Sequence, residues 1–250
     1  MTSCESLNNK KYLLVLNGVE DYLQVVLGTK DRLLWAWQAF TFQKGMLFLG
    51  PQLEYLFSSL AISPNQLKSI VLVSGPGSFT GLRLTFAHAY GLALGAQVPL
   101  GSIEYLPLVA KSIPLKKEIW VLTYSRQKEV YIQGFDSKKS PLTPPKAINL
   151  SQAQEILKKR PSDIILTGSG LRKHPQILSW GFTTLEETFD TPLPQVLLKE
   201  AFCAKSSSNA PLPIYLRASN AEDNLEKIIQ QTGLSLKEAQ KKLFSGSKIS

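Results

Sequence analysis

The chain has 250 residues, of which 44% are hydrophobic and 19% are charged, which is enough apolar content for one large core or two small ones. This composition excludes a disordered chain, and no apolar run reaches the roughly 18 residues that would span a bilayer. The net charge is +9, and most of the excess lies in residues 111–220, which favours contact with RNA or an acidic partner as much as plain solubility.

Two features bear on the compartment. The first fifteen residues lack a long apolar core and a small-residue cleavage site, so we expect a cytoplasmic protein with no membrane contact. Cys4 and Cys203 lie in unrelated contexts and predict neither a disulfide nor a metal site.

The first half of the chain alternates apolar runs with turns. Its patterns predict three strands, a helix, a strand and a helix, over residues 12–16, 22–27, 33–40, 47–60, 70–73 and 82–94. Strands in a row followed by alternating helix and strand predict a mixed sheet covered by helices, which is the duplicated unit of actin-like and Hsp70-like α/β folds.

The second half repeats this order on a smaller scale. We expect a hairpin over residues 119–135, a loop over 137–145, a helix capped by Ser151, and a strand at 164–166 that ends in a glycine turn. A brief strand at 214–216 and two terminal helices at 224–232 and 236–244 follow. The predicted domains are residues 10–111 and 112–218, both actin-like, with a helical extension over 219–250 that either docks a partner or tRNA or packs as a tail.

The turn after the fourth strand carries the strongest local signal. Residues 75–83 read GPGSFTGLR, in which glycines permit positive φ, a hydroxyl can cap the helix, and free amides near an arginine can hold an anion. The candidate anion or nucleotide loop comprises Gly75, Gly77, Ser78, Thr80, Gly81 and Arg83. The alternative is that a tight strand-to-helix turn needs these residue types. The pattern matches neither a P-loop nor the dinucleotide fingerprint.

Four ordered blocks resemble the TsaB (YeaZ) family. They are GPGSFTGLR at 75–83 with GLALG at 91–95, an arginine at 126 followed by EVY at 129–131, LTGSG at 166–170, and PIYLR at 213–217. The resemblance covers roughly residues 12–218 and implies an actin-like fold. The chain departs from the family pattern at Asn17, at residues 43–45 (QKG) and at Tyr124.

The resemblance also implies a function. Family members are non-catalytic paralogues of TsaD, and with TsaD and the ATPase TsaE they attach threonylcarbamoyl to the adenosine next to the anticodon of tRNA. It implies no metal and no cofactor, with ATP or ADP held only at the interface with TsaD, and a homodimer when the subunit is alone. The sequence agrees in that His88 and His174 cannot form the His-x-x-x-His pair of TsaD-like chemistry.

The two long helices supply a route to partner binding. Ala87, Gly91 and Gly95 recur every four residues, so another helix could approach closely, although a neighbouring helix of this chain could also cover that face. The predicted interface comprises Leu53, Leu56, Phe57, Leu82, Arg83, Phe86, Ala87, Tyr90, Gly91 and Leu94.

Two other functions stay open at this point. The first is an enzyme, either an actin-fold phosphotransferase that uses Ser78, Thr80 and Arg83 around a nucleotide, or a metallopeptidase-like protein. The second is a stand-alone RNA-binding protein that uses the basic middle region.

Overall fold

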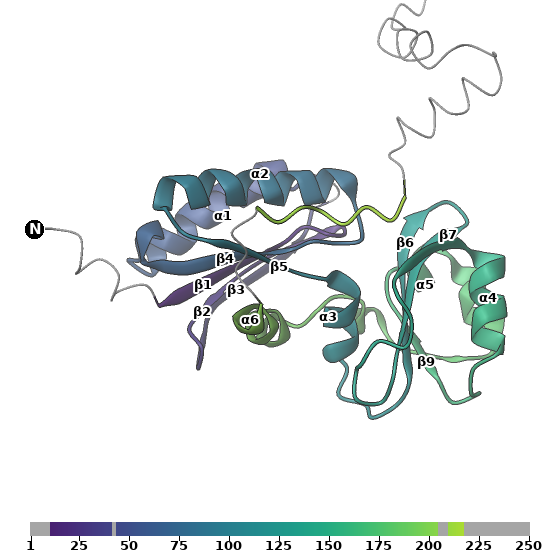
Figure 1. Cartoon of the computed structure of the whole chain (residues 1–250). Helices are drawn as coiled ribbons and strands as arrows, with labels where there is room; N and C mark the ends of the chain where they lie inside the picture. Colours follow the sequence, from purple (N-terminus) through teal and green to yellow (C-terminus); the bar gives the residue numbers. More distant parts are fainter. Residues whose placement is uncertain (1–10, 42–43, 205–209, 218–250) are drawn as a thin grey trace, which may run out of the picture. The chain divides into compact units, whose positions relative to one another are not determined.

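The computed structural model describes residues 11–41, 44–204 and 210–217. The described residues up to Ile214 belong to one compact unit, and Tyr215 begins another. The first unit contains two five-stranded sheets (Figure 1). We call each sheet with the helices that lie on it a lobe.

The first lobe is built on a mixed sheet with strand order β3-β2-β1-β4-β5. Its strands are β1 (Tyr12–Asn17), β2 (Tyr22–Gly28), β3 (Leu33–Phe40), β4 (Leu67–Val73) and β5 (Leu100–Ile103). β1 and β2 pair antiparallel, as do β2 and β3, whereas β1, β4 and β5 run parallel. Helices α1 (Met46–Ser59) and α2 (Phe79–Ala96) cover one face, and α6 (Pro194–Cys203) lies on the other (Figure 1).

The second lobe repeats this topology. Its strands are β6 (Ile119–Arg126), β7 (Glu129–Phe135), β8 (Lys146–Asn149), β9 (Ile165–Thr167) and β10 (Thr183–Thr184). Read from β8, the order β8-β7-β6-β9-β10 matches the first sheet read from β3 in both order and direction. The predicted α/β fold with two βββαβα units of the actin-like type is therefore confirmed.

Short helices complete the structure. They are α3 (Tyr105–Lys111), α4 (Leu150–Lys158) and α5 (Gly170–Lys173), with 3-10 turns η2 (Pro64–Gln66), η3 (Pro175–Trp180) and η4 (Glu187–Phe189). Helix α3 contacts α6 of the first lobe and β6 and β7 of the second. The chain thus leaves the first sheet at α3, builds the second lobe, and returns to the first sheet with α6.

The cores explain why the central strands read as continuous apolar runs. Residues 13–16 of β1 are at most 2% exposed, because helices cover both faces of the sheet. The edge strand β3 instead alternates between partly buried and exposed positions. In the second lobe one apolar cluster joins β6, β7 and β9 to α4 and α5.

A tryptophan fills much of the second sheet's face. Trp120 is 2% exposed, and a Cβ at Gly134 on β7 would lie 2.7 Å from its indole ring. The indole N–H donates to Glu118 at 2.7 Å, and Arg160 donates two bonds to the same carboxylate. A side chain at residue 134 would therefore displace the indole.

Several sequence predictions need correction. Helix α4 is capped by Asn149, whose Oδ1 accepts from Gln152 N at 2.9 Å, so Ser151 lies inside the helix. Residues 214–216 form no strand: Ile214 N donates to Ser74 O at 2.7 Å, but the preceding Pro211 and Pro213 have no N–H group with which to extend a ladder. Strands β5 and β8 and helix α3 were not predicted, and the expected helices at 224–232 and 236–244 lie outside the described residues.

Candidate functional site

The glycine turn packs directly on the turn between β1 and β2. Gly75 has a φ of +103°, which favours glycine. A Cβ at Gly77 would lie 2.3 Å from Val19 O, and a Cβ at Gly81 would lie 1.9 Å from Gly18 O. These glycines are explained by the close approach of two backbone segments.

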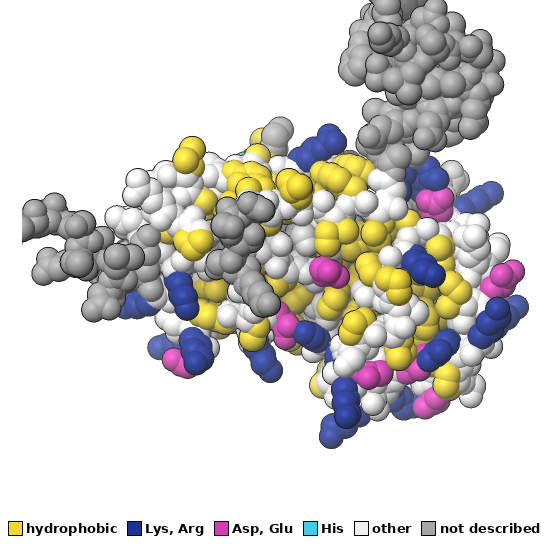
Figure 2. Space-filling view, viewed as in Figure 1, with side chains coloured by type: hydrophobic (Ala, Val, Ile, Leu, Met, Phe, Trp, Pro, Cys, Tyr) yellow, Lys and Arg dark blue, Asp and Glu magenta, His cyan; other side chains and the backbone are white. Residues whose placement is uncertain are grey.

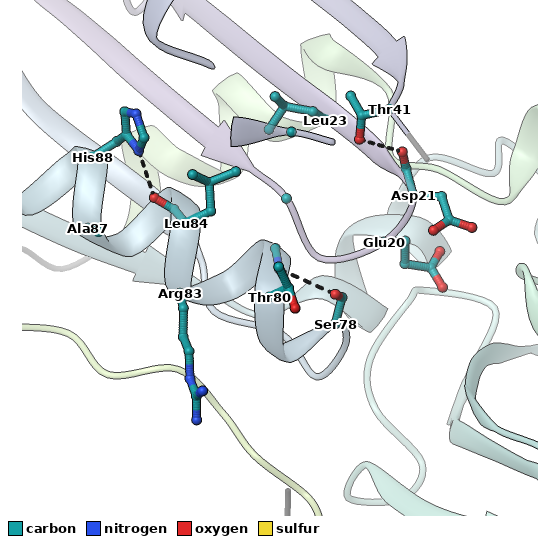
Figure 3. A pocket seen from close by; sticks show the side chains of 13 residues that line it. Glu20, Asp21, Leu23, Thr41, Ser78, Thr80, Arg83, Leu84, Ala87 and His88 are labelled. Carbon is teal, nitrogen blue, oxygen red and sulfur yellow. Dashed lines mark hydrogen bonds between the residues drawn. The ribbon is translucent and has the colours of Figure 1, made fainter. Parts of the chain in front are cut away.

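Two amides of this turn have partners in the chain. Ser78 N donates to Val19 O at 2.7 Å, and the Ser78 hydroxyl caps α2 by accepting from Gly81 N at 3.3 Å. Arg83 is exposed, its guanidinium lies 5.8 Å from the Phe79 ring, and Figure 3 shows it directed away from Ser78 and Glu20. The geometry supports the structural explanation of the turn, and anion binding stays a prediction.

A cavity of about 510 Å³ lies beside this turn (Figure 3). His88 on α2 lies at its wall, with Nδ1 3.0 Å from Leu84 O. The residues that line the cavity are Gly18, Glu20, Asp21, Leu23, Thr41, Gly45, Ser78, Thr80, Gly81, Arg83, Leu84, Ala87 and His88. Carboxylates of the β1–β2 turn and apolar side chains of α2 therefore share one cavity.

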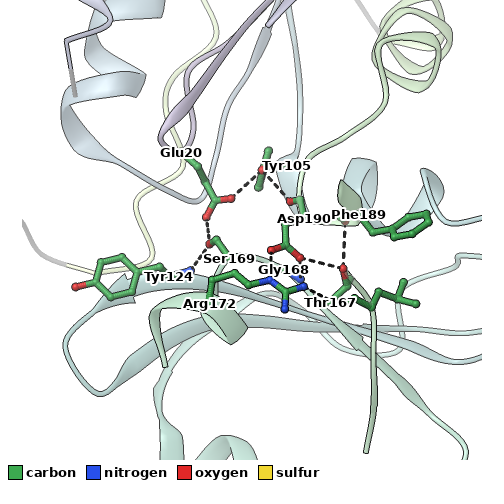
Figure 4. Close-up of polar contacts among 10 residues, drawn as sticks. Glu20, Tyr105, Tyr124, Thr167, Gly168, Ser169, Arg172, Phe189 and Asp190 are labelled. Carbon is green, nitrogen blue, oxygen red and sulfur yellow. Dashed lines mark hydrogen bonds and ion pairs between the residues drawn. The ribbon is translucent and has the colours of Figure 1, made fainter. Parts of the chain in front are cut away.

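Glu20 joins the two lobes (Figure 4). Its carboxylate accepts a bond from the Tyr105 hydroxyl at 2.9 Å and another from the Ser169 hydroxyl. Ser169 Oγ in turn accepts from Tyr124 N at 2.9 Å. Burial raises the pKa of Glu20 to about 7, although these two hydrogen bonds act in the opposite direction.

A second carboxylate organises the turn after β9. Asp190 accepts from Gly168 N at 2.8 Å and from Arg172 Nε at 3.0 Å, and burial raises its pKa. Lys173 pairs with Asp21 of the first lobe at 3.2 Å. The β1–β2 turn of the first lobe thus contacts the β9–α5 turn of the second through side chains of this chain.

The predicted interface residues fall into two groups. Leu53, Leu56, Leu82 and Phe86 are at most 8% exposed and belong to the core of the first lobe, so their assignment to an outer surface is corrected. Phe57 and Tyr90 are partly buried, and the Tyr90 hydroxyl donates to Pro211 O. Arg83, Ala87, Gly91 and Leu94 are exposed. The periodic apolar pattern could not separate the two groups because both faces of the helices are apolar.

An apolar face remains uncovered in the part of the chain that the structure describes. Leu94 is 82% exposed, Leu47 is 69% exposed, Tyr55 is 60% exposed, and nothing lies within 4 Å of a Cβ built at Gly91 or Gly95. We call these five residues, with Ala87, the outer face of α1 and α2. Hydrophobic side chains gather over these helices in Figure 2.

The sequence reasoning missed the contact between the lobes. No sequence pattern connects Glu20 or Asp21 with the second lobe, since their partners Ser169 and Lys173 are about 150 residues away in the sequence. His174 is 6% exposed, and its Nε2 lies 3.2 Å from Glu129 O.

The departures from the family pattern also have local roles. Asn17 donates to Gln24 at 2.6 Å and accepts from Val19 N, so it holds the β1–β2 turn. The Tyr124 ring contacts His174. Within the described residues, no three His, Cys, Asp or Glu side chains are grouped to hold a metal, and no helix is long and apolar enough to cross a membrane.

Several known proteins are similar to this chain. A family model described as TsaD, tRNA N6-adenosine threonylcarbamoyltransferase, matches residues 48–156. A tRNA threonylcarbamoyladenosine biosynthesis protein TsaB from Buchnera aphidicola subsp. Baizongia pistaciae is 29% identical over 52% of this chain and 62% of that protein, which is less than two thirds of its length. The protein of the same description from Bacillus subtilis is 26% identical over 69% of this chain and 79% of that protein.

A solved structure agrees with the sequence matches. YeaZ from Pseudomonas aeruginosa superposes with a TM-score of 0.65 at 18% identity, covering 82% of this chain and all of that one. At this identity the likeness concerns the fold.

Proposed function

We propose that this chain, which is similar to TsaB proteins, acts in tRNA threonylcarbamoyladenosine biosynthesis as a partner subunit without chemistry of its own. It pairs with a TsaD-like catalytic subunit through the outer face of α1 and α2, and a TsaE-like ATPase joins the pair. The complex meets tRNA in the cytoplasm. Any ATP or ADP is held between the two subunits, and the chain forms a homodimer when alone.

The outer face is the observation that carries this proposal. Exposed leucines cost free energy in water, about 25 cal/mol for each Å² of apolar surface that a partner would bury. The absence of side chains at Gly91 and Gly95 lets a second helix approach to about 8 Å. An apolar face with small residues at its centre therefore fits a partner helix.

The TsaD match indicates what kind of partner fits. The matched residues 48–156 contain most of α1 and all of α2. A protein that shares these elements can present the same helices, so the two surfaces can meet in a near-symmetric pair, as in isologous interfaces. The same argument accounts for a homodimer in the absence of TsaD.

The absence of chemistry of its own is supported by the glycine turn. An anion pocket at a helix start needs backbone N–H groups that point at the ligand. Here Ser78 N and Gly81 N are bonded to Val19 O and Ser78 Oγ. A phosphotransferase that used this turn would first have to separate it from the β1–β2 turn.

Co-elution of the purified chain with its TsaD homologue from the same cell tests the proposal. We expect a complex with the wild type and at least a tenfold weaker one with Leu94→Glu, because a charge would be buried at the contact. Leu178→Glu is the matched control, since Leu178 is 49% exposed on the second lobe.

Two results would overturn the proposal. The first is no complex under any nucleotide condition, or equal weakening by both variants. The second is ATP turnover by the purified chain that disappears in Arg83→Ala, which would favour a phosphotransferase.

A further inference from the structure

One end of the second sheet gathers positive charge. Ile119 at the start of β6 lies in register with Phe135 at the end of β7 and with Ile165 at the start of β9. Neighbouring strands lie about 4.8 Å apart, so the three loops at this end form one continuous surface. These loops are residues 112–118, 136–145 and 159–164.

The loops and the end of α4 carry seven basic and three acidic side chains. The basic ones are Lys116, Lys117, Lys138, Lys139, Lys158, Lys159 and Arg160, and the acidic ones are Glu118, Asp136 and Asp163. Two contacts link the loops to one another: Lys139 donates to Leu115 O at 2.5 Å, and Lys117 Nζ lies 3.6 Å from Asp163 Oδ2. We call this surface the basic end of the second lobe.

The acidic side chains are already engaged. Glu118 accepts two bonds from Arg160, and these bonds lower its pKa. Asp136 accepts from the backbone amides of Lys138 and Ser140 at 2.8 Å and shapes its own loop. Asp163 pairs with Lys117, although its side chain is 71% exposed.

Four lysines have no acidic partner among the described residues. Lys116, Lys138, Lys158 and Lys159 are all exposed. Their ammonium groups repel one another in the absence of a polyanion, and an anion that neutralises several of them releases its own counterions. The surface is therefore suited to a ligand with many closely spaced negative charges.

The composition of the loops favours RNA over an acidic protein. Specific protein interfaces centre on buried aromatic anchors, and the three loops contain no Phe, Tyr or Trp. Lysines on separate loops can each contact a different phosphate without reading a base. The basic end also lies on the second lobe, whereas the outer face of α1 and α2 lies on the first.

We propose that the basic end of the second lobe binds the sugar–phosphate backbone of RNA. This inference rests on the proposed function, in which the RNA is the tRNA that the complex modifies. The contact positions the RNA and carries no sequence preference. The chain then contributes two surfaces, one for the partner and one for the substrate.

Binding of the full chain to a transcribed tRNA over a salt series tests the inference. We compare the wild type with a variant in which Lys116, Lys138, Lys158 and Lys159 are all changed to Gln. The logarithm of the binding constant decreases as the logarithm of the salt concentration increases. We expect the four-Gln variant to show a slope that is less steep than that of the wild type by about 3, since each phosphate contact contributes slightly less than one unit.

The matched control removes the same charge elsewhere. Lys11, Lys30, Lys68 and Lys199 are exposed on the first lobe, and changing these four to Gln should reduce the slope by less than one unit. Equal slopes for the two variants would overturn the assignment to the basic end. Equal affinity of the wild type for polyglutamate and tRNA at matched charge would replace RNA by an acidic protein. Co-elution with TsaD is measured separately, so failure here leaves the pairing result intact.

Discussion

The two lobes share one topology and differ in the length of their helices. Helix α2 has 18 residues and α5, at the equivalent place after the fourth strand, has 4. Helix α5 is so short that its apolar residues only contact its own sheet. Helix α2 covers its sheet with one face and still presents an outer face. The first lobe therefore presents an exposed helix face, and the second lobe presents basic side chains at one end of its sheet.

Both lobes nevertheless use glycine in the same way after the fourth strand. A Cβ at Gly168 would lie 2.3 Å from Leu122 O, just as a Cβ at Gly81 would meet Gly18 O. In each lobe the glycine lets the start of a helix pack against a neighbouring backbone segment. The comparison indicates that these glycines are required by the fold, since both lobes need them at the same place.

The largest effect should come from a methyl group at this turn. Gly81→Ala places Cβ 1.9 Å from Gly18 O, so the backbone of one of the two turns has to move. We therefore expect the free energy of unfolding to decrease by more than about 4 kcal/mol. Gly91→Ala in the same helix meets nothing within 4 Å and should gain about 0.5–1 kcal/mol. Urea unfolding of both variants measures these changes. A Gly81→Ala variant as stable as the wild type would contradict the close approach of residue 81 to Gly18 O.

The next largest effect is a difference in stability between variants on the buried face and variants on the exposed face of the first lobe's helices. Leu56 is fully buried, so Leu56→Ala should cost about 2–5 kcal/mol in stability. Leu94→Ala should change stability by less than about 0.5 kcal/mol, because Leu94 is 82% exposed. Thermal unfolding of the two variants measures this difference, and similar melting temperatures would contradict the corrected interface.

The smallest effect concerns the contact between the lobes. The pKa of Glu20 is raised from 4.5 to about 7 in the folded chain, so its contribution to stability is full below about pH 4.5 and is lost as the pH rises through about 7. Glu20→Gln stays neutral and should be more stable than the wild type at pH 8 by at most about 3 kcal/mol, which is the shift of the Glu20 pKa at about 1.4 kcal/mol per pKa unit.

The control for this experiment is Glu155→Gln, an exposed carboxylate on α4. Denaturant unfolding of wild type and variants between about pH 5 and pH 8 measures the difference. Parallel pH profiles for wild type and Glu20→Gln would show that Glu20 is charged in the contact between the lobes.

The fold could be predicted from the sequence because its signals are local. The three-strand meander, the glycine turn and both long helices follow from runs and periods within about 20 residues. Strand β5 at residues 100–103 was missed since LGSI offers neither alternation nor a long apolar run. Helix α3 was missed because its seven residues follow directly and carry Pro107.

The site was predicted less well because it depends on contacts distant in sequence. No residue near Glu20 in the sequence indicates that Tyr105 and Ser169 are its partners. The sequence therefore predicts a turn at Glu20 and no contact with the second lobe. Periodicity marked Leu56 and Leu94 alike as apolar helix residues, and only the packed structure distinguishes core from outer face.

The return of α6 to the first sheet has a consequence for synthesis on the ribosome. A Cβ at Gly28 on β2 would lie 2.4 Å from the Leu198 side chain, so α6 packs closely on β2. The ribosome synthesises β2 about 170 residues before α6. The underside of the first sheet stays exposed until α6 leaves the exit tunnel. The first lobe is therefore completed after the second, and a nascent chain halted before residue 194 presents an open apolar sheet to chaperones.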